Sequence, residues 1–208
     1  MPSAIPYDLL MTIQRGTMAY RYRDRPMLKN PFDLALYPLL LAKLRPRTII
    51  EIGSFQGGSA LWFADTARNL GLDAHVHSVD IARVSDLPDP AVTFYRGNGR
   101  TLSDPFTDAM LSAFPRPWLV IEDADHQYET TMAALRFFDQ WLVSGDYIIV
   151  EDGILTDMLV EAAYDGGPDR AIQDFLASAP DRYVIDRSYC DYFGENVTWN
   201  INGYLRRL

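Results

Sequence analysis

Four carboxylates stand at the ends of two apolar segments of this sequence. Asp123 and Asp125 follow the first segment, and Glu151 and Asp152 follow the second. If the two segments are neighbouring strands of one sheet, about 4.8 Å apart, the four groups lie close enough to repel one another and to raise each other's pKa. A hard divalent cation such as Mg²⁺, which takes oxygen ligands, would remove that repulsion. The residues alone leave two interpretations open, a metal site or acids solvated at the strand ends.

A histidine directly follows the first acidic pair. The imidazole of His126 titrates near neutral pH, so it is a candidate general base for a group bound at the acidic cluster. A histidine that only supports the site is the alternative. The other two histidines, His75 and His77, lie inside a predicted strand and are interpreted as structural.

A glycine-rich loop is the second segment whose composition could do chemistry. Residues 49–61 pass from an apolar run through Gly53, Gly57 and Gly58 into a helix-like pattern. Glycine has no Cβ, so this backbone can turn sharply and approach a ligand. The unpaired N–H groups at the start of the following helix could hold a polar group. A tight turn without a ligand is the alternative, but three glycines flanked by a carboxylate and a hydroxyl favour a ligand site.

The spacing of the glycines restricts the kind of ligand. It differs from the Gly-x-Gly-x-x-Gly of dinucleotide enzymes and from the Gly-x-x-x-x-Gly-Lys of phosphate-binding loops, and no lysine follows the loop. Asp80 ends the next predicted strand, where it could accept hydrogen bonds from ribose hydroxyls. An exposed acid at a strand end is the alternative for Asp80, but together with the loop it favours ribose binding.

The elements that position these groups alternate between strands and helices. Continuous apolar runs predict strands at residues 47–52, 73–79, 92–96, 118–122 and 147–150, and two final strands at 182–187 and 196–206. Helices are expected at residues 31–44, 58–70, 102–114, 130–142 and 167–178. This order predicts an α/β fold with a mostly parallel sheet covered on both faces. Ligands of such sheets bind beyond the carboxyl ends of the strands, where the acids and the glycines are expected to meet.

The predicted domain organisation is simple. Residues 31–208 form one domain, and residues 1–30 form an N-terminal segment that could act as a lid, beginning with a short helix over residues 7–14. Residues 157–166 could also fold over the site. Three aromatic residues between the last two strands, Tyr189, Tyr192 and Phe193, could line an acceptor pocket or serve in packing.

The amino-acid composition indicates which kinds of binding partner and which cellular compartment to expect. The 208 residues carry a net charge of −9, so the protein has no general attraction to nucleic acid or to anionic membranes. The single cysteine, Cys190, excludes an intramolecular disulfide. The N-terminus lacks the pattern of a signal peptide, and the apolar residues 34–44 are too few to span a bilayer. A cytoplasmic protein with a small-molecule partner is expected, and a homo-oligomer is compatible with the sequence.

The motifs together resemble a known family. Glu51-Ile-Gly53-x-x-x-Gly57-Gly58-Ser59, followed by Asp80 and by Asn98-Gly99, is similar to the cofactor site of class I S-adenosylmethionine-dependent methyltransferases. More closely, the chain resembles the cephalosporin hydroxylase family, which has the methyltransferase fold and whose relatives include sugar O-methyltransferases of natural-product pathways. The segments that carry this closer resemblance are Lys29-Asn-Pro-x-Asp33, Asp123-Ala-Asp125-His126, and residues 145–152, 167–176 and 202–207.

The resemblance implies a Rossmann-like class I methyltransferase with a seven-stranded sheet and an antiparallel C-terminal strand. It implies an O-methyltransferase that uses S-adenosylmethionine and Mg²⁺, or another hard divalent cation, on a hydroxyl of a small natural product or sugar. His126 and Asp123 are the expected catalytic residues. The expected metal ligands are Asp123, Glu151 and Asp152, with Asp125 as the alternative first ligand. The expected cofactor-binding residues are Glu51, Gly53, Ser54, Gly57, Gly58, Ser59, Asp80, Asn98, Gly99 and Asp123.

Two other functions are weighed against this one. An iron-dependent hydroxylase, which the family name suggests, would need two histidines and one carboxylate, and only His126 is expected at the site. A non-catalytic protein that binds S-adenosylmethionine is the other alternative, and the acidic clusters argue against it. The acceptor could be a sugar, a polyketide, a phenol or a peptide hydroxyl.

Overall fold

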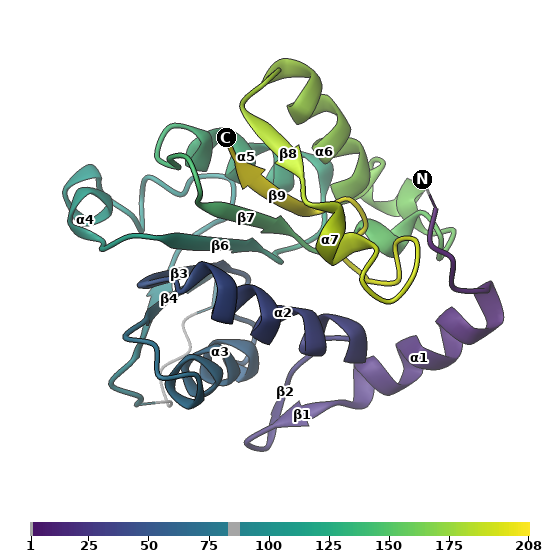
Figure 1. Ribbon diagram of the computed structural model, residues 1–208, viewed down its shortest axis with the longest axis horizontal. Helices are drawn as coiled ribbons and strands as arrows, with labels where there is room; N and C mark the ends of the chain where they lie inside the picture. The colour runs from purple at the N-terminus through teal and green to yellow at the C-terminus, as the bar shows by residue number, and fades with distance from the viewer. Residues whose placement is uncertain (1, 83–87) are drawn as a thin grey trace.

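A seven-stranded sheet forms the centre of the molecule (Figure 1). The computed structural model describes residues 2–82 and 88–208. The strand order is β5-β4-β3-β6-β7-β9-β8, and only β9 runs antiparallel to its neighbours. The predicted fold class is therefore confirmed. The strands are β3 (Thr48–Ile52), β4 (His75–Asp80), β5 (Val92–Arg96), β6 (Trp118–Glu122), β7 (Tyr147–Val150), β8 (Tyr183–Ile185) and β9 (Tyr204–Arg207).

The register of the parallel strands brings their carboxyl ends to one edge. Ile52 at the end of β3 lies opposite both Val79 of β4 and Glu122 of β6. Glu122 in turn lies opposite Val150, the last residue of β7. The glycine loop and both acidic pairs therefore begin at the same level of the sheet.

Helices cover both faces of the sheet (Figure 1). Buried side chains of α2 (Pro31–Leu44) and α3 (Gly58–Asn69) pack on one face, together with the short α7 (Arg187–Cys190). Those of α5 (Tyr128–Asp139) and α6 (Gly167–Ser178) pack on the other, beside α4 (Asp108–Ala113). The two apolar layers explain why the central strands are buried on both sides and read as continuous hydrophobic runs.

The start of α2 follows the prediction closely. The side-chain oxygen of Asn30 accepts hydrogen bonds from the backbone N–H groups of Phe32 at 2.9 Å and Asp33 at 3.1 Å, and Pro31 occupies the first helical position. These contacts satisfy two of the N–H groups that a helix start leaves unpaired. They also fix the chain immediately after Lys29, a residue that reaches the site.

The N-terminal segment is more ordered than predicted. Helix α1 (Tyr7–Ala19) continues beyond Gln14, and the two-residue strands β1 (Arg21–Tyr22) and β2 (Arg25–Pro26) form a hairpin. Apolar residues of α1 pack against Trp199 and against the 3-10 turn η1 (Gly153–Leu155). Met1 lies outside the described residues. Figure 1 shows α1 at the periphery, connected to α2 through the hairpin.

Two predicted elements are wrong in their extent. The helix expected at residues 102–114 begins only at Asp108, because Pro105 disfavours helical geometry before it and Thr107 caps the later start. The strand expected at residues 196–206 begins only at Tyr204. The chain before it turns so that the Thr198 hydroxyl and the Trp199 N–H can donate to the buried carboxylate of Asp33.

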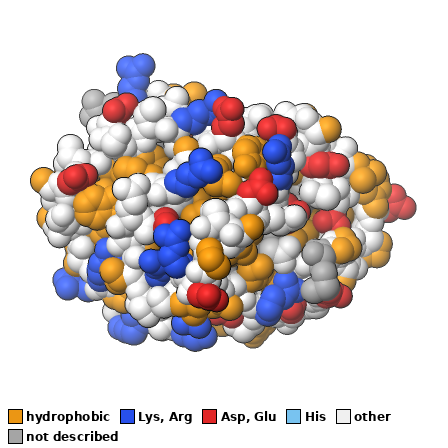
Figure 2. Space-filling view, turned by 90° about the horizontal axis from the view of Figure 1, so that it is seen from above, with side chains coloured by type: hydrophobic (Ala, Val, Ile, Leu, Met, Phe, Trp, Pro, Cys, Tyr) orange, Lys and Arg blue, Asp and Glu red, His pale blue; other side chains and the backbone are white. Residues whose placement is uncertain are grey.

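The surface carries both kinds of charge. Figure 2, which views the molecule from above, shows acidic and basic side chains interspersed over that face with hydrophobic ones between them. Among the described residues, no helix is long and apolar enough to cross a membrane.

Candidate active site

A cavity of about 470 Å³ opens beyond the carboxyl ends of the parallel strands. One side, which we call the glycine wall, comes from the ends of β3, β4 and β5. The opposite side, which we call the acid wall, follows β6 and β7. The glycine wall consists of Gly53, Ser54, Ser59, Asp80, Asn98 and Gly99. The acid wall consists of Asp123, Asp125, His126 and Asp152.

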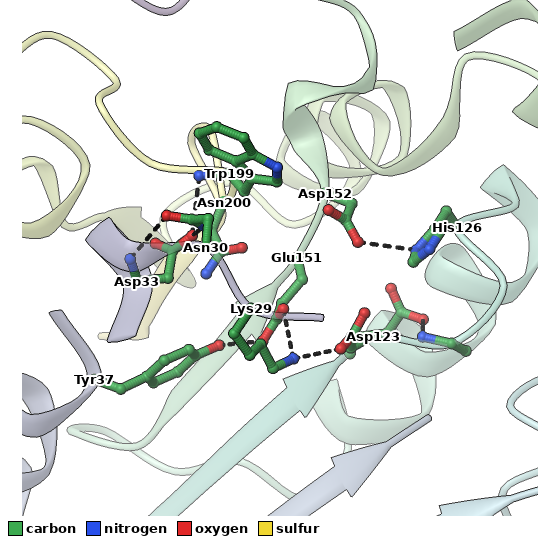
Figure 3. Close-up of polar contacts among 12 residues, drawn as sticks. Lys29, Asn30, Asp33, Tyr37, Asp123, His126, Glu151, Asp152, Trp199 and Asn200 are labelled. Carbon is green, nitrogen blue, oxygen red and sulfur yellow. Dashed lines mark hydrogen bonds and ion pairs between the residues drawn. The ribbon is translucent and has the colours of Figure 1, made fainter. Parts of the chain in front are cut away.

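Three side chains of the acid wall converge. Asp123, His126 and Asp152 each offer one ligand atom, and these atoms lie within 4.8 Å of one another. His126 Nδ1 is 3.3 Å from Asp152 Oδ2 (Figure 3). Both His126 and Asp152 have left-handed backbone conformations, with φ of 58° and 59°. Such conformations are uncommon outside glycine and cluster at functional sites, where the surrounding fold holds them in place.

The proximity of these groups shifts their protonation. Burial raises the pKa of Asp152 to about 6, although the neighbouring His126 opposes the shift. Burial alone would lower the pKa of His126, but the carboxylates of Asp152 and Asp123 outweigh it and raise that pKa. The carboxylates therefore stabilise the protonated form of the imidazole relative to its neutral form.

Glu151 does not join this group. Its buried carboxylate accepts a hydrogen bond from the Tyr37 hydroxyl at 2.5 Å and lies 2.6 Å from the ammonium nitrogen of Lys29 (Figure 3). In this arrangement His126, and not the predicted ligand Glu151, stands with Asp123 and Asp152. Glu151 directly follows β7, and its carboxylate turns toward a buried cation of the chain itself.

Lys29 is the residue that the sequence analysis missed. It is 3% exposed, and its ammonium group contacts both Asp123 and Glu151. Burial alone would lower its pKa, but the carboxylates of Asp123, Glu151 and Glu51 raise it. Lys29 is therefore a permanent positive charge beneath the acid wall. The Asn30 cap marks only where the chain enters α2, and no local signal in the sequence identifies the distant partners of Lys29.

Asp125, the alternative first metal ligand, lines the cavity but stands apart from the three converging groups. It is exposed, and its carboxylate accepts a hydrogen bond from the Gln127 N–H at 3.1 Å. Of the two aspartates of this loop, Asp123 is the one that lies with His126 and Asp152.

Close packing explains the glycines of the loop. Gly53 has a φ of 106°, and a Cβ there would lie 1.8 Å from the carbonyl oxygen of Asp123. A Cβ on Gly58 would lie 2.4 Å from the carbonyl oxygen of Pro26 in the N-terminal hairpin. Gly53 lines the cavity, whereas Gly57 and Gly58 do not. Gly58 therefore approaches the protein's own backbone at Pro26 and not the cavity.

The two acids expected at the cofactor differ in position. Asp80 lines the cavity and accepts hydrogen bonds from the backbone N–H groups of Phe55 at 2.8 Å and Ala82 at 2.9 Å. Glu51 is fully buried behind the cavity, where the Ser78 hydroxyl donates to it. Asp80 can still accept bonds from a ligand, whereas Glu51 does not line the space where a ligand would lie.

The three aromatic residues for which a pocket role or a packing role was left open lie outside the lining of the cavity. Tyr189 is buried in the core, and Phe193 packs against Phe32 with ring centroids 5.6 Å apart. Neither residue lines the cavity, and Tyr192 does not either. The lining comes instead from α1 and from the segment around the 3-10 turn η2 (Glu161–Tyr164), through Gln14, Thr17, Met18, Leu155, Met158, Tyr164 and Trp199.

The walls together define what the cavity can hold. The glycine wall offers backbone groups, hydroxyls and one carboxylate, which suit a nucleoside with an amino-acid chain. The converging group of the acid wall offers two carboxylates and an imidazole, which suit a divalent cation. A cation there would lie beside the nucleoside site and not within it.

Comparisons with known proteins agree with this arrangement. A family model described as "Rhamnosyl O-methyltransferase/CmcI" matches residues 14–93 and 107–208. A rhamnosyl O-methyltransferase of Mycobacterium leprae is 32% identical over 188 residues, covering 86% of this chain and 80% of the relative. One of Mycobacterium tuberculosis (strain H37Rv) is 29% identical, covering 86% of this chain and 74% of the relative.

Solved structures give the same result. A CmcI structure described as containing Mg and SAM superposes with a TM-score of 0.70 and 26% identity, covering all of this chain and 87% of that one. A CmcI structure with SAH has the same TM-score and identity and is covered over 94% of its length. The chain belongs to the Rhamnosyl O-methyltransferase/CmcI family.

Proposed function

We propose that this protein is an S-adenosylmethionine-dependent and Mg²⁺-dependent O-methyltransferase that methylates a hydroxyl of a small molecule, a sugar or another natural product. The observation that carries the proposal is the meeting of Asp123, His126 and Asp152 in one cavity with the glycine wall. Family membership supports it, because the relatives are named as rhamnosyl O-methyltransferases and a CmcI structure contains Mg and SAM.

The glycine wall suits the cofactor. Ser54, Ser59 and the backbone at Gly53 would hold its amino-acid end, and Asp80 would accept hydrogen bonds from the ribose. Asn98 and Gly99 would border the nucleoside. When bound, S-adenosylmethionine supplies an electrophilic methyl group. Glu51, Gly57 and Gly58 support this wall from behind.

The acid wall suits the metal. Asp123 and Asp152 would hold Mg²⁺ through their carboxylates, with His126 beside it, and Glu151 would support them through Lys29. When bound, the metal lowers the pKa of a hydroxyl that it contacts. Lys29 keeps the buried charges balanced and holds the Asp123 side chain in position.

Side chains of the acid wall can accept the proton that the acceptor hydroxyl loses. The Asp152 carboxylate faces His126 Nδ1 at 3.3 Å, which fixes the ring orientation and stabilises its protonated form. When the imidazole is neutral and carries its proton on Nδ1, the Nε2 atom can accept a proton from a hydroxyl, and Asp152 then stabilises the imidazolium that forms. His126 therefore acts as the general base, and Asp152 positions it. The surrounding side chains exclude water and hold the acceptor hydroxyl near the methyl group.

The iron-dependent hydroxylase fits less well. It needs two histidines and one carboxylate. Among the described residues of the acid wall there is one histidine and there are three carboxylates. The remaining histidines lie on β4, where His75 bonds to Thr93 and His77 bonds to Tyr95.

We also propose a cytoplasmic location and a small-molecule partner. The net charge of −9 disfavours nucleic acid, and the buried Cys190 suits a reducing compartment.

The test is methyl transfer from isotope-labelled S-adenosylmethionine to a panel of rhamnosides, other glycosides and phenols, with Mg²⁺ or with EDTA. We expect transfer to at least one hydroxylated compound, and loss of transfer in EDTA. Binding of S-adenosylhomocysteine is measured in parallel by calorimetry. Cofactor binding without transfer to any compound would support the non-catalytic binder, and failure to bind the cofactor product would overturn the proposal.

A further inference from the structure

Helix α1 presents one face to the cavity and the opposite face to solvent. Leu10 is buried on the inner face, and Gln14 of that face lines the cavity. Leu9, Thr12 and Gly16 lie on the outer face and are exposed. Figure 1 shows α1 at the edge of the molecule, with no other described element on its outer side. The outer face is therefore a free surface directly behind residues that line the cavity.

The outer face is apolar and open where it meets α2. A groove of about 350 Å³ runs between the two helices, and its apolar lining comes from Ile13, Gly16, Tyr20, Pro31 and Leu34. Leu9 lies two turns before Gly16 on the same side of α1 and is 52% exposed. A Cβ at Gly16 would meet no atom within 4 Å. A second helix can therefore approach α1 closely here and remove apolar surface from water.

Two opposite charges flank this apolar surface. Asp8 and Arg15 are exposed, and their spacing of seven residues places them on the same side of α1. Neither forms an ion pair with another described residue, and the Arg15 guanidinium donates only to the Thr12 hydroxyl at 3.0 Å. The outer face of α1 thus carries one acid and one base. It lacks the excess of positive charge that would attract an anionic membrane or a nucleic acid.

The order of these two charges makes the face complementary to itself. In two antiparallel α1 helices related by a two-fold axis, the residues on one side of each helix lie opposite the same side of the other. Such a contact joins residue i to residue j in both directions. Asp8 of each copy would therefore face Arg15 of the other, while the apolar residues beside them meet across the axis.

We propose that the outer face of α1 is the interface at which two copies of this chain form a dimer, with their α1 helices antiparallel. Leu9 and Tyr20 of each copy pack against the open surface at Gly16 and the groove beside α2 of the other. The two Asp8–Arg15 pairs fix the orientation of the helices. The inference goes beyond the proposed function, because the association does not depend on the reaction.

The dimer would also support the cavity. Of the 13 residues of α1, only Leu10 and Thr17 are buried in the single chain. A helix of this length is marginal in water without packing against other elements. Contacts on the outer face would hold α1 in place, and with it the residues of the inner face that line the cavity.

The test is the molecular mass of the full chain, measured by sedimentation equilibrium over a wide range of protein concentration at low salt. We expect the wild-type protein to have twice the mass of one chain. Asp8→Arg and Arg15→Asp each place like charges opposite one another, and each should weaken association by about tenfold or more. The double variant restores opposite charges with the signs exchanged, so it should associate as the wild type does.

Two further variants separate the interface from general effects. Gly16→Arg fills the surface that the second helix would occupy but meets no atom of its own chain, so it should fold and remain a single chain. Asp108→Arg is the matched control, since it reverses an exposed acid in the first turn of α4, at the opposite end of the molecule (Figure 1). It should leave the mass unchanged. Circular dichroism shows that each variant is folded.

Three results would overturn the proposal. The first is a wild-type protein that has the mass of one chain at every concentration, including one that instead cosediments with phosphatidylglycerol vesicles. The second is a dimer that persists in Gly16→Arg and in both single charge reversals, because the interface would then lie elsewhere. The third is a double variant that associates no better than the single variants. None of these results involves methyl transfer, so the proposed function is tested separately.

Discussion

The two walls of the cavity present different chemical groups to a ligand. The glycine wall uses backbone groups, two small hydroxyls and one carboxylate, Asp80, which accepts one N–H bond from its own loop and one from the glycine loop. The acid wall concentrates ionised side chains above a lysine that is 3% exposed. A surface made of backbone can hold a ligand with little electrostatic cost. A surface made of buried charges is costly unless each charge has a partner, but it can polarise a substrate.

The largest effect on this difference between the walls is expected from removing the buried ammonium group of Lys29. Lys29→Met leaves Asp123 and Glu151 without their counter-charge, and breaking a buried ion pair costs about 3–5 kcal/mol. We expect the free energy of unfolding to fall by that amount in urea denaturation at neutral pH. Lys43→Met is the matched control, because Lys43 is exposed and makes one contact over the Tyr189 ring. Equal losses in the free energy of unfolding for the two substitutions would show that the Lys29 ion pairs contribute nothing beyond an ordinary surface contact.

Asp152→Asn tests whether the acid wall performs the chemistry. The substitution keeps the shape but removes one candidate metal ligand and the partner of His126. We expect kcat for methyl transfer to fall roughly 10²–10³-fold, equivalent to about 3–4 kcal/mol. Binding of S-adenosylhomocysteine, which we propose to occur at the glycine wall, should change less than about twofold.

The control for this prediction is Asp125→Asn, which changes an exposed acid of the same wall outside the converging group. It should keep most of the activity. A loss in Asp125→Asn as large as that in Asp152→Asn would support Asp125 as the first metal ligand in place of Asp123.

Gly53→Ala tests the close contact between the two walls, where Gly53 of the glycine wall packs against the backbone of Asp123 in the acid wall. Its Cβ would lie 1.8 Å from the Asp123 carbonyl oxygen, so the two loops must move apart. We expect a loss of roughly 3 kcal/mol in stability from overpacking and backbone strain. Gly71→Ala shares a positive φ, of 64°, but has open space around it, and should cost only about 1 kcal/mol. Similar melting temperatures for both variants would contradict the close approach of the walls.

The smallest expected effect is on the glycine wall alone. Asp80→Asn keeps the size of the side chain but weakens its acceptance of ribose hydroxyls. We expect S-adenosylhomocysteine to bind about tenfold more weakly by calorimetry, since a hydrogen bond to a charged group contributes about 1.5 kcal/mol. Mn²⁺ affinity should stay the same. A change in metal affinity without a change in cofactor affinity would reverse the assignment of the two walls.

The sequence was most informative where local chemistry decides the structure. Apolar runs located the central strands within one or two residues, and the Asn30 cap with Pro31 located the start of α2. The polar residues after β3, β4 and β6 were correctly expected at one edge, because parallel strands bring their carboxyl ends together.

The parts that could not be predicted depend on contacts between distant segments. Lys29 lies 94 residues before Asp123 in the chain, and nothing local shows that its side chain will occupy the space between Asp123 and Glu151. Gln14 meets Trp199 across 185 residues. The extent of β9 was missed for the same reason, since the buried carboxylate of Asp33 holds the preceding residues in a turn.

The central claim is that a metal and a nucleoside cofactor occupy opposite walls of one cavity. Anomalous diffraction from crystals grown with Mn²⁺ and S-adenosylhomocysteine tests it most directly. The prediction is an anomalous peak in contact with Asp123 and Asp152, with the nucleoside lying along Gly53, Asp80 and Asn98. A peak elsewhere, or a nucleoside that lies against Asp152, would contradict it.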